Sequence, residues 1–547
     1  MKLSCCWSFS LFLLMCIPQC GAQAPESYRG LLTRQVASAR LSPPQDLKNH
    51  VSDGKLSLGL RDAVILALEN NSDVRIQEAE VETEKFSLLS LYQPFDPLLQ
   101  AIANVNRYSY SGYTELQGVG NSSNATFNSL TQIGQITYTQ TFETGTNVNV
   151  GISSTKSSTN SAFYYFNPYF NSIVDLQITQ PLLRNAGRFA NMAPLVIARR
   201  TLQQSRATFA AEVNDSILRV VSQYWTVVQV RGNLQVQRKS LDLAEASYNH
   251  DKRALELGAL PPLDIYRSES EVAARRLQMI QTEYTLKQAE EALRLSIGAD
   301  QDPAIHALEL ELTEKPEPDG KLEAIDIATA LQEALARRPE IEAAGYALAN
   351  DETGIRLAHN HLLPDLELYG FYQSSGLGGN QYNLTTGQLI AHGGLGSSFS
   401  QLGGFSYPGY GGTVTLNLPI KNRQAQAALG TALVSRRRDL YSAQQAREAI
   451  TSEVSNAVHG LEEAKLTLEA GKTSFELAQK SLTAEQRKYE LGAQTNFFVL
   501  DAQARLADAE LQLLQTQINY QVARAAFDHA TGSLLEPYHV QIAELTR

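Results

Sequence analysis

The chain has 547 residues and a formal net charge of −11. Its length allows several domains. The acidic excess argues against binding nucleic acid or an anionic membrane surface through bulk charge attraction, so no nucleic-acid partner is expected.

The first 22 residues are predicted to form a secretory signal peptide. An apolar run over residues 7–17 is followed by small residues up to Ala22. The run is far shorter than the ~20 residues that a membrane-spanning helix needs. Cleavage after Ala22 leaves a mature chain without thiols, because all four cysteines precede it (Cys5, Cys6, Cys16 and Cys20). Lipidation at Cys20 is the alternative, which the two larger residues before it disfavour.

Most of the chain repeats itself. Leu-Gly-Ala occurs at residues 257–259 and again at 491–493, and a glycine follows each tripeptide 40 positions later, Gly298 or Gly532. Between them, apolar residues recur at every seventh position in both copies. Self-similarity on this scale indicates a duplicated architectural unit.

The duplication divides the chain into parts. These are a signal peptide (residues 1–22), an N-terminal extension (23–55), a first structural repeat (56–300), a linker (301–321), a second structural repeat (322–535) and a C-terminal tail (536–547). The extension is polar and contains prolines, which predicts no regular structure. The linker is rich in proline and acidic residues.

Each repeat is predicted to contain the same elements in the same order. A first helix (58–92; 324–361) is followed by strands, a very long helix (188–257; 423–491), a glycine break and a last helix (264–296; 497–530). The second first helix is interrupted at Arg338-Pro339, because the residue before a proline disfavours helical angles. About 70 residues at ~1.5 Å per residue make a rod of ~100 Å, which must lie along equally long partners.

Heptad spacing indicates how these helices associate. The last helix of the second copy has three apolar columns, which begin at Phe497, Val499 and Leu500. Two columns suffice for a two-stranded coiled coil, whereas three give an apolar face ~160° wide that can contact two neighbours. We therefore expect a helical wall. An ordinary bundle is the alternative, although bundle helices seldom run this long.

The strand zones alternate in polarity. Within residues 413–420, Val414, Leu416 and Leu418 share one face and polar residues the other, and residues 135–150 and 173–182 alternate similarly. Segments of ~10 alternating residues near aromatic clusters are what a membrane β-barrel requires. One face of a soluble sandwich is an alternative that alternation leaves open.

The first copy carries 29 extra residues between its strands, since Pro97 and Pro181 are 84 positions apart but Pro364 and Pro419 only 55. This excess contains a hairpin-like stretch over residues 135–153, turning at 143–145. The second copy has a Gly/Ser-rich loop over residues 374–412. Both insertions are expected in outer loops, where length is tolerated.

Two strands per copy provide four principal strands per chain, too few to close a useful barrel. An open sheet edge in lipid leaves peptide groups unpaired at several kcal/mol each, so the chain must associate with identical chains. These unpaired edges require an oligomer but do not give the number of copies; with three copies there would be twelve strands and twelve helical columns, a ring with a lumen.

The duplicated order of elements behind a secretory signal resembles the TolC family of outer membrane efflux ducts. The most specific motifs lie at residues 63–71, 180–183 and 489–502. The resemblance implies a mainly α fold with a membrane β-barrel: a homotrimer whose twelve-stranded barrel in the outer membrane lipid continues as a long α-helical barrel across the periplasm.

The same resemblance implies a function. Such proteins are the outer membrane channels of tripartite efflux or type I secretion systems, and they accept cargo from an inner-membrane transporter through a periplasmic adaptor protein. They catalyse no bond chemistry and need no cofactor or metal, so an enzyme is not expected. Cargo is selected largely upstream, in the transporter.

The resemblance also implies an aperture at the periplasmic end. Asp264 and Tyr489 match an inter-helix hydrogen-bonded pair that holds such ducts shut, and Asp501 matches a constricting acidic residue. Gln494 stands at the position of a gating arginine, and Phe498 replaces another constricting aspartate. The mouth should combine a carboxylate ring with an apolar ring and so close by dewetting as well as by charge.

Ordinary structural roles remain alternatives for these residues. Asp264 could cap a helix or interact with its dipole, and Asp501 could occupy a solvated helix position. The tips that meet adaptor hairpins in the family correspond to six residues, for which a simple helix break is the alternative: Leu257, Gly258, Ala259, Leu491, Gly492 and Ala493.

Other motifs point to no chemistry. Gly471-Lys472-Thr473 resembles the end of a phosphate loop, but Leu466 occupies the position of its first glycine. His359 and His361 have no third metal ligand nearby and fit a helix end.

Two alternative functions remain. A secreted structural coiled-coil protein would account for the heptads but not for the paired strands. A periplasmic adaptor usually has one helical hairpin rather than two copies of a four-part unit.

Overall fold

The computed structural model describes residues 46–52, 54–111, 126–257, 264–318, 326–491, 493–494 and 496–538. The predicted signal peptide and most of the predicted extension and tail lie outside these ranges.

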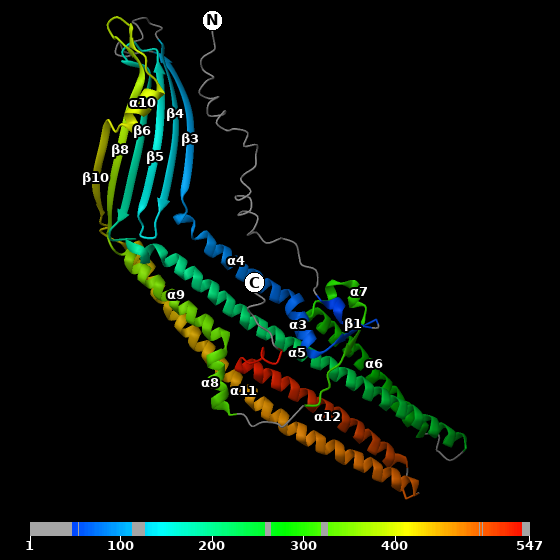
Figure 1. Cartoon of the computed structure of the whole chain (residues 1–547). Coiled ribbons are helices and arrows are strands. Elements are labelled where there is room, and N and C mark those ends of the chain that lie inside the picture. The colour runs from blue at the N-terminus through cyan, green and yellow to red at the C-terminus, as the bar shows by residue number, and fades with distance from the viewer. Residues whose placement is uncertain are drawn as a thin grey trace, which may run out of the picture. The chain divides into compact units, whose positions relative to one another are not determined.

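A seven-stranded antiparallel sheet forms one part of the fold (Figure 1). Its order is β10-β8-β6-β5-β4-β3, and the short β9 pairs with β8. The strands are β3 (Leu98–Ser111), β4 (Thr126–Thr141), β5 (Asn147–Thr159), β6 (Phe166–Pro181), β8 (Asp365–Tyr382), β9 (Leu389–Ala391) and β10 (Tyr407–Asn417).

The register gives the sheet one apolar and one polar face, as the alternation predicts. Residues paired across the strands bring together a set of exposed apolar side chains: Ile136, Tyr138, Val150, Ile152, Leu176, Ile178, Leu368, Tyr372, Val414 and Leu416. Between them in sequence, and therefore on the opposite face, lie Gln135, Thr137, Asn149, Ser153, Asp175, Gln177, Gln373 and Thr415.

Six of the strands are long, so the expectation of four principal strands per chain is wrong. The additional pair is the hairpin β4–β5, which lies between β3 and β6 within the sheet. A hairpin in this region was expected, but its turn is not in an outer loop. Residues 142–146 lie against the start of α5 (Gly187–Glu256), where the Gly187 N–H donates to the Thr144 carbonyl oxygen (3.2 Å).

The Gly/Ser-rich stretch expected to be a loop is also more ordered than predicted. It contains the end of β8, β9, the helix α10 (Leu395–Gly403) and the start of β10. α10 lies over β8 on the apolar face, where a Cβ at Gly376 or Gly378 would overlap its backbone. The Ser398 hydroxyl donates to the Gly376 carbonyl oxygen (2.8 Å), so glycine permits an approach that a side chain would prevent.

The helices agree closely with the predicted periodicity. They are α3 (Leu60–Asn70), α4 (Ser72–Ser90), α5, α6 (Asp264–Ser296), α7 (Pro303–His306), α8 (Ile327–Arg337), α9 (Pro339–His361), α11 (Arg423–Glu490) and α12 (Asn496–Thr531). The break at Pro339 is confirmed, but the first helix also breaks at Asn71, whose side chain accepts from the Asp73 N–H (2.8 Å) and caps α4. Among the helices in the described ranges, none has an 18-residue window apolar enough to cross a membrane.

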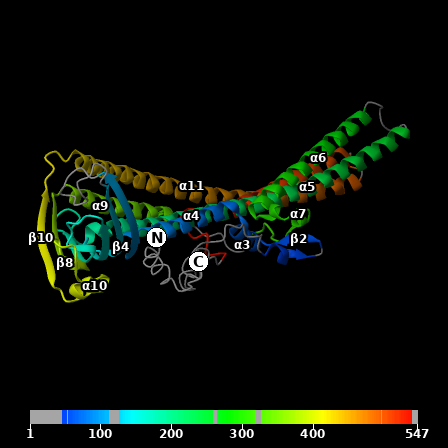
Figure 2. The same ribbon diagram turned by 90° about the horizontal axis from the view of Figure 1, so that it is seen from above.

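Four helical columns lie side by side. Next to the sheet their order is α4-α5-α9-α11, and beyond it the order is α6-α5-α12-α11 (Figures 1 and 2). Each column beside the sheet is joined directly to one strand: α4 to β3, α5 to β6, α9 to β8 and α11 to β10. The helices therefore follow the order of the strands, except that the β4–β5 hairpin has no helix of its own.

A small sheet covers the side of α5. It contains β1 (Val51–Ser52), β2 (Lys55–Leu58) and β7 (Glu309–Leu312), and the 3₁₀ turn η1 (Leu47–His50) precedes it. The prediction of no regular structure before residue 56 is thus wrong from Leu47 onward, and the predicted linker supplies β7. The Tyr224 hydroxyl donates to the Leu58 carbonyl oxygen (3.2 Å) and accepts from the Glu314 N–H (3.2 Å), and burial raises its pKa to about 12.

The two repeats end alike. Gly298 and Gly532 follow the last helices with positive φ angles of 71° and 75°, which glycine adopts readily. A Cβ at Gly298 would lie 2.5 Å from Asn70 Cβ, and one at Gly532 would lie 3.2 Å from Arg337 Cβ. Both glycines therefore let the end of the last helix approach the end of the first.

Close packing of α11 on α12 predicts unequal effects of one substitution at two glycines. A Cβ at Gly471 would lie 2.8 Å from Thr516 Oγ1 on α12, whereas one at Gly460 meets nothing within 4 Å. We expect Gly471→Val to lower the free energy of unfolding by about 1–3 kcal/mol more than Gly460→Val. Both variants place the same β-branched residue in one helix, so helix propensity cancels. Thermal unfolding followed by circular dichroism measures the difference, and equal melting temperatures would contradict the packing.

Candidate functional site

The tips of the two long helix pairs hold most of the predicted site residues. α5 ends at Glu256 and α11 at Glu490, and each is followed by an exposed leucine. Leu257 is 84% exposed and Leu491 78% exposed, the kind of apolar exposure that marks a contact surface. Ala493 is exposed as well. Gly258, Ala259 and Gly492 lie outside the described residues.

The turn after α11 is closed by backbone hydrogen bonds. The Leu491 N–H donates to the Arg487 carbonyl oxygen (3.2 Å), and the Ala493 N–H donates to that of Lys488 (2.9 Å). Such bonds satisfy carbonyl groups at a helix C-terminus. Gln494 follows half-buried, and within the described part of the chain its buried Oε1 has no hydrogen-bond partner. An unpaired buried amide oxygen costs about 1–3 kcal/mol.

The start of α12 carries the other predicted aperture residues. Phe498 is 45% exposed. Asp501 forms an ion pair with Arg505 one turn later (2.9 Å), so its carboxylate is already compensated in the single chain. The predicted pair of Asp264 and Tyr489 involves side chains that lie outside the described residues, although both backbones belong to the helix ends.

A buried charged cluster in the second repeat escaped sequence reasoning. Arg338, at the break between α8 and α9, contacts Glu340 (2.7 Å) and Glu453 of α11 (3.0 Å). His529 of α12 contacts Glu453 (2.9 Å) and Asp215 of α5 (2.7 Å). The cluster therefore joins all the helices that meet at this point.

The electrostatics of the cluster favour its charged form. Burial opposes a charge on His529, but hydrogen bonds to Asp215 and Glu453 outweigh it and raise the pKa of the imidazole to about 9. The hydrogen bond from His529, reinforced by Arg338, lowers the pKa of Glu453 to about 2 despite partial burial. The charged Arg338 before Pro339 was the one sequence signal for this contact.

The first repeat has a simpler version of the same joint. Asn71, at the break between α3 and α4, donates to the Ser296 carbonyl oxygen at the end of α6 (3.2 Å). Arg338 donates in the same way to the His529 carbonyl oxygen near the end of α12 (3.1 Å). Asp73 and Arg219 form an exposed ion pair beside the first joint (3.3 Å).

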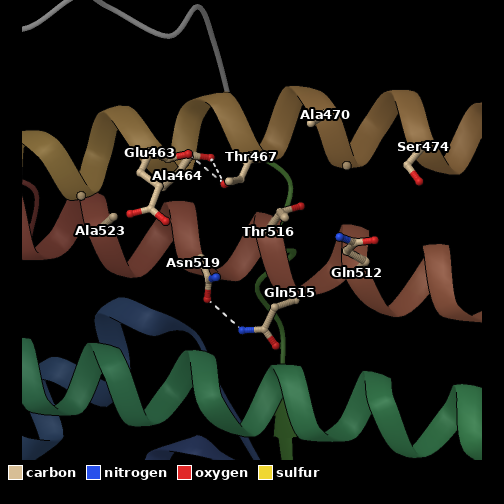
Figure 3. Close-up of a pocket in the computed structure, with 12 residues that line it drawn as sticks. Glu463, Ala464, Thr467, Ala470, Ser474, Gln512, Gln515, Thr516, Asn519 and Ala523 are labelled. Carbon is tan, nitrogen blue, oxygen red and sulfur yellow. Dashed lines mark hydrogen bonds between the residues drawn. The ribbon is translucent and has the colours of Figure 1, made fainter.

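A shallow groove of about 550 Å³ runs between α11 and α12 (Figure 3). It is lined by Gly460, Glu463, Ala464, Thr467, Ala470, Gly471, Ser474, Gln512, Gln515, Thr516, Asn519 and Ala523. Gln515 and Asn519 hydrogen-bond each other (2.9 Å), and Glu463 is the only charged residue in this lining. The groove therefore offers steric and hydrogen-bonding recognition, without a nucleophile–base pair.

Charge is sorted between the two faces of the sheet. The six long strands, as described, contain three carboxylates, and the register puts Asp175, Asp365 and Glu367 on the polar face. Their two cations, Arg107 and Lys156, lie on the apolar face towards the ends of the strands remote from the helices. The polar face thus presents net negative charge and favours cations over anions near it.

The family model for outer membrane efflux proteins matches residues 146–299 and 330–533, more than half of the chain and both repeats. The chain belongs to the outer membrane efflux protein family. The predicted resemblance to TolC-like proteins is therefore confirmed.

Named relatives of the family are distant. The pyoverdine export outer membrane protein OpmQ of Pseudomonas putida is 25% identical over 323 residues, which cover 57% of this chain and 61% of the relative. The outer membrane protein TolC of Vibrio cholerae is 23% identical over 344 residues, covering 62% and 72%. The matches to OpmQ and to the toluene efflux pump protein TtgC span about three fifths of those relatives.

Solved structures confirm the fold class over nearly the whole chain. A membrane protein from Pseudomonas aeruginosa aligns with a TM-score of 0.60 at 18% identity, covering 91% of this chain and 98% of its own. CusC aligns with a TM-score of 0.59 at 17% identity, covering 91% and 99%. The mainly α fold with a membrane-type sheet is thus shared with outer membrane channels of this family.

The charged cluster predicts a pH-dependent stability with a definite sign. Because the pKa of His529 is raised, its protonated ring contributes fully to the free energy of unfolding below pH 6.5. This contribution is lost as the pH rises through about 9. Burial raises the pKa of Asp528 to about 6, so that carboxyl titrates below this window. Between pH 7 and 9.5 we expect the free energy of unfolding of the wild-type chain to fall by about 1–3 kcal/mol more than that of His529→Gln. The difference is modest because Asp215 is partly exposed and its interaction with His529 is screened.

Melting temperatures across this pH range measure the loss. His459→Gln is the matched control, because His459 lies on α11 with a side chain that is 65% exposed. Parallel pH profiles for wild type and His529→Gln would contradict the role of the cluster.

Proposed function

We propose that this protein is the outer membrane duct of a tripartite efflux or type I secretion system. Three identical chains would form the duct and pass cargo from an inner-membrane transporter and a periplasmic adaptor to the cell exterior. The proposal places the sheet in the outer membrane and the helical columns in the periplasm.

The observation that carries the proposal is the open sheet with an exposed apolar face. Within the described residues, β3 pairs only with β4 and β10 only with β8, so each outer edge leaves peptide groups unpaired. Lipid would contact the apolar face, and in lipid such edges are costly unless another strand pairs with them. β3 leads away from the helices and β10 leads back, so β10 of one copy can pair antiparallel with β3 of the next.

The helical columns extend the same ring. α4 and α6 lie at one side of the wall and α11 at the other, so copies joined at the sheet would also place α11 beside the next chain's α4 and α6. The polar face of the sheet would then line a water-filled lumen. A secreted coiled-coil protein would have no use for such a sheet.

The exposed tips support contact with an adaptor. Leu257 and Leu491 are apolar, exposed and placed equivalently in the two repeats. A ring of three chains would present six such tips, a repeated surface that suits helical hairpins of a partner. OpmQ and TtgC bear names of export and efflux components, which agrees with this assignment.

The predicted aperture residues would form a constriction only when several chains come together. We assign the constriction to Gln494, Phe498 and Asp501, together with the pair Asp264 and Tyr489. Phe498 would contribute an apolar ring that water leaves readily.

Two measurements on the full chain test the duct. The purified protein should migrate as a trimer on gels without heating and as a monomer after heating, and it should conduct ions in planar lipid films. Recovery as a single subunit without conductance would refute the proposal.

The aperture predicts a graded effect at Phe498. Phe498→Ser should raise single-channel conductance several-fold, because a hydroxyl holds water where the ring excludes it. Phe498→Leu keeps an apolar ring and serves as the control, with conductance close to wild type. If the serine variant conducts no more than the leucine variant, Phe498 does not line the constriction.

A further inference from the structure

The strands and the helical columns share one order but differ in number. Along the sheet, β3, β6, β8 and β10 each continue into a helix, and those helices stand in the order α4-α5-α9-α11. The hairpin β4–β5 lies between β3 and β6 without a helix. It therefore widens the sheet while leaving the helical wall unchanged.

Elementary dimensions show what the hairpin achieves. Four helices packed 8–10 Å apart occupy an arc of about 32–40 Å. Strands spaced ~4.8 Å apart and tilted by ~40° take up ~6 Å of circumference each, so six strands span about 37 Å. Without the hairpin, four strands would span only about 25 Å at this tilt. Six strands at this tilt span the helical arc of the same chain.

The hairpin is fixed to the wall at its turn. Glu143 forms an ion pair with Arg188 at the start of α5 (2.6 Å), and Thr146 donates to Gln180 at the end of β6. Gly145, with a φ of 84°, packs so closely that a Cβ would lie 2.9 Å from Pro181 Cγ. Its strands alternate like the rest of the sheet, with Ile136 and Ile152 on the apolar face. The hairpin is thus held in place like the other strand pairs of the sheet.

We infer that the closed cylinder contains eighteen strands, six from each of three chains, and not the twelve expected from the family resemblance. The inference rests on the proposed trimeric duct. Eighteen strands give a circumference of about 113 Å and a backbone diameter of about 36 Å, against about 24 Å for twelve. The helical barrel then continues into the sheet without a step.

This width determines the class of cargo that the strands admit. After ~6 Å of side chains on each side, a lumen of about 24 Å remains, against about 12 Å for twelve strands at the same tilt. One α-helix with its side chains is ~10–12 Å across. The eighteen-strand lumen is therefore wide enough for helical hairpins and peptides as well as small solutes.

Engineered cysteines test whether the hairpin lies between β3 and β6 in the sheet of the assembled protein. Ile102, Gln135, Ser153 and Ile173 lie in one register row across β3, β4, β5 and β6. All native cysteines precede residue 21, so a mature chain cut after Ala22 gives no background. Disulfides require Cα atoms about 4.4–6.8 Å apart, which neighbouring strands satisfy and strands three intervals apart do not.

We expect the pairs Ile102→Cys/Gln135→Cys and Ser153→Cys/Ile173→Cys to form disulfides in membranes, and Ile102→Cys/Ile173→Cys to remain reduced. Disulfide formation by the last pair would show that β3 contacts β6 directly and that the hairpin lies outside the wall. That result would overturn the inference even if the protein is a conducting trimer. A chain that never forms trimers would instead refute the proposed function.

Polymer partitioning provides a second measurement on wild-type channels. Polyethylene glycols of graded size are added on the strand side of a planar lipid film, and the largest that lowers the conductance reports the width of the strand lumen. We expect entry of polymers up to roughly 20 Å across. Exclusion of everything above about 12 Å would contradict the eighteen-strand cylinder.

A chain lacking residues 126–159 is the matched variant, because β3 and β6 remain antiparallel and able to pair. In this variant the polymer cutoff should fall by about half. A variant that fails to assemble leaves the cysteine pairs and the wild-type cutoff to decide.

Discussion

The unpaired edges of one sheet constrain everything else in this protein. The outward-facing peptide groups of β3 and β10 have no strand partner among the described residues, and water, the usual substitute, is absent from the hydrocarbon layer. Only another strand can satisfy them at that depth. The apolar face, the polar face and the antiparallel order of the edges all follow from that requirement, because a closed cylinder needs each of them.

The second requirement is a rigid link between the repeats and the long helices. In each repeat, a glycine with positive φ ends the last helix, and a polar side chain at the break of the first helix caps it: Asn71 in one copy and Arg338 in the other. The second joint adds His529, whose buried ring is compensated by the partly exposed carboxylates of Glu453 and Asp215. The joints tie the end of each last helix to the break in the first helix and, in the second repeat, to α5 and α11 as well.

Most of the secondary structure could be predicted from short-range sequence patterns. The bounds of α5, α6, α11 and α12 follow from heptad spacing and glycine breaks, and the break between α8 and α9 follows from Pro339. All of these signals act within a few residues. The presence of six long strands was not predicted, because the pairing of β4 and β5 with their neighbours is non-local. Their Gly, Thr and Gln content also weakens the alternation. α10 was missed because its nine residues are Gly- and Ser-rich, and contact with Gly376 and Gly378 stabilises it. The charged cluster draws on four separate segments, so no window of sequence contains it.

The hairpin found in only one repeat also decides what symmetry the molecule presents to its surroundings. In the proposed trimer, two equivalent halves per chain would give approximate sixfold symmetry at the helical tips, where Leu257 and Leu491 are both exposed leucines. In the sheet, β4 and β5 have no counterpart in the second half, and the symmetry there would therefore be only threefold. In the proposed trimer, a partner that contacts the helical tips would therefore meet six near-equivalent sites, whereas one that contacts the far end of the strands would meet three.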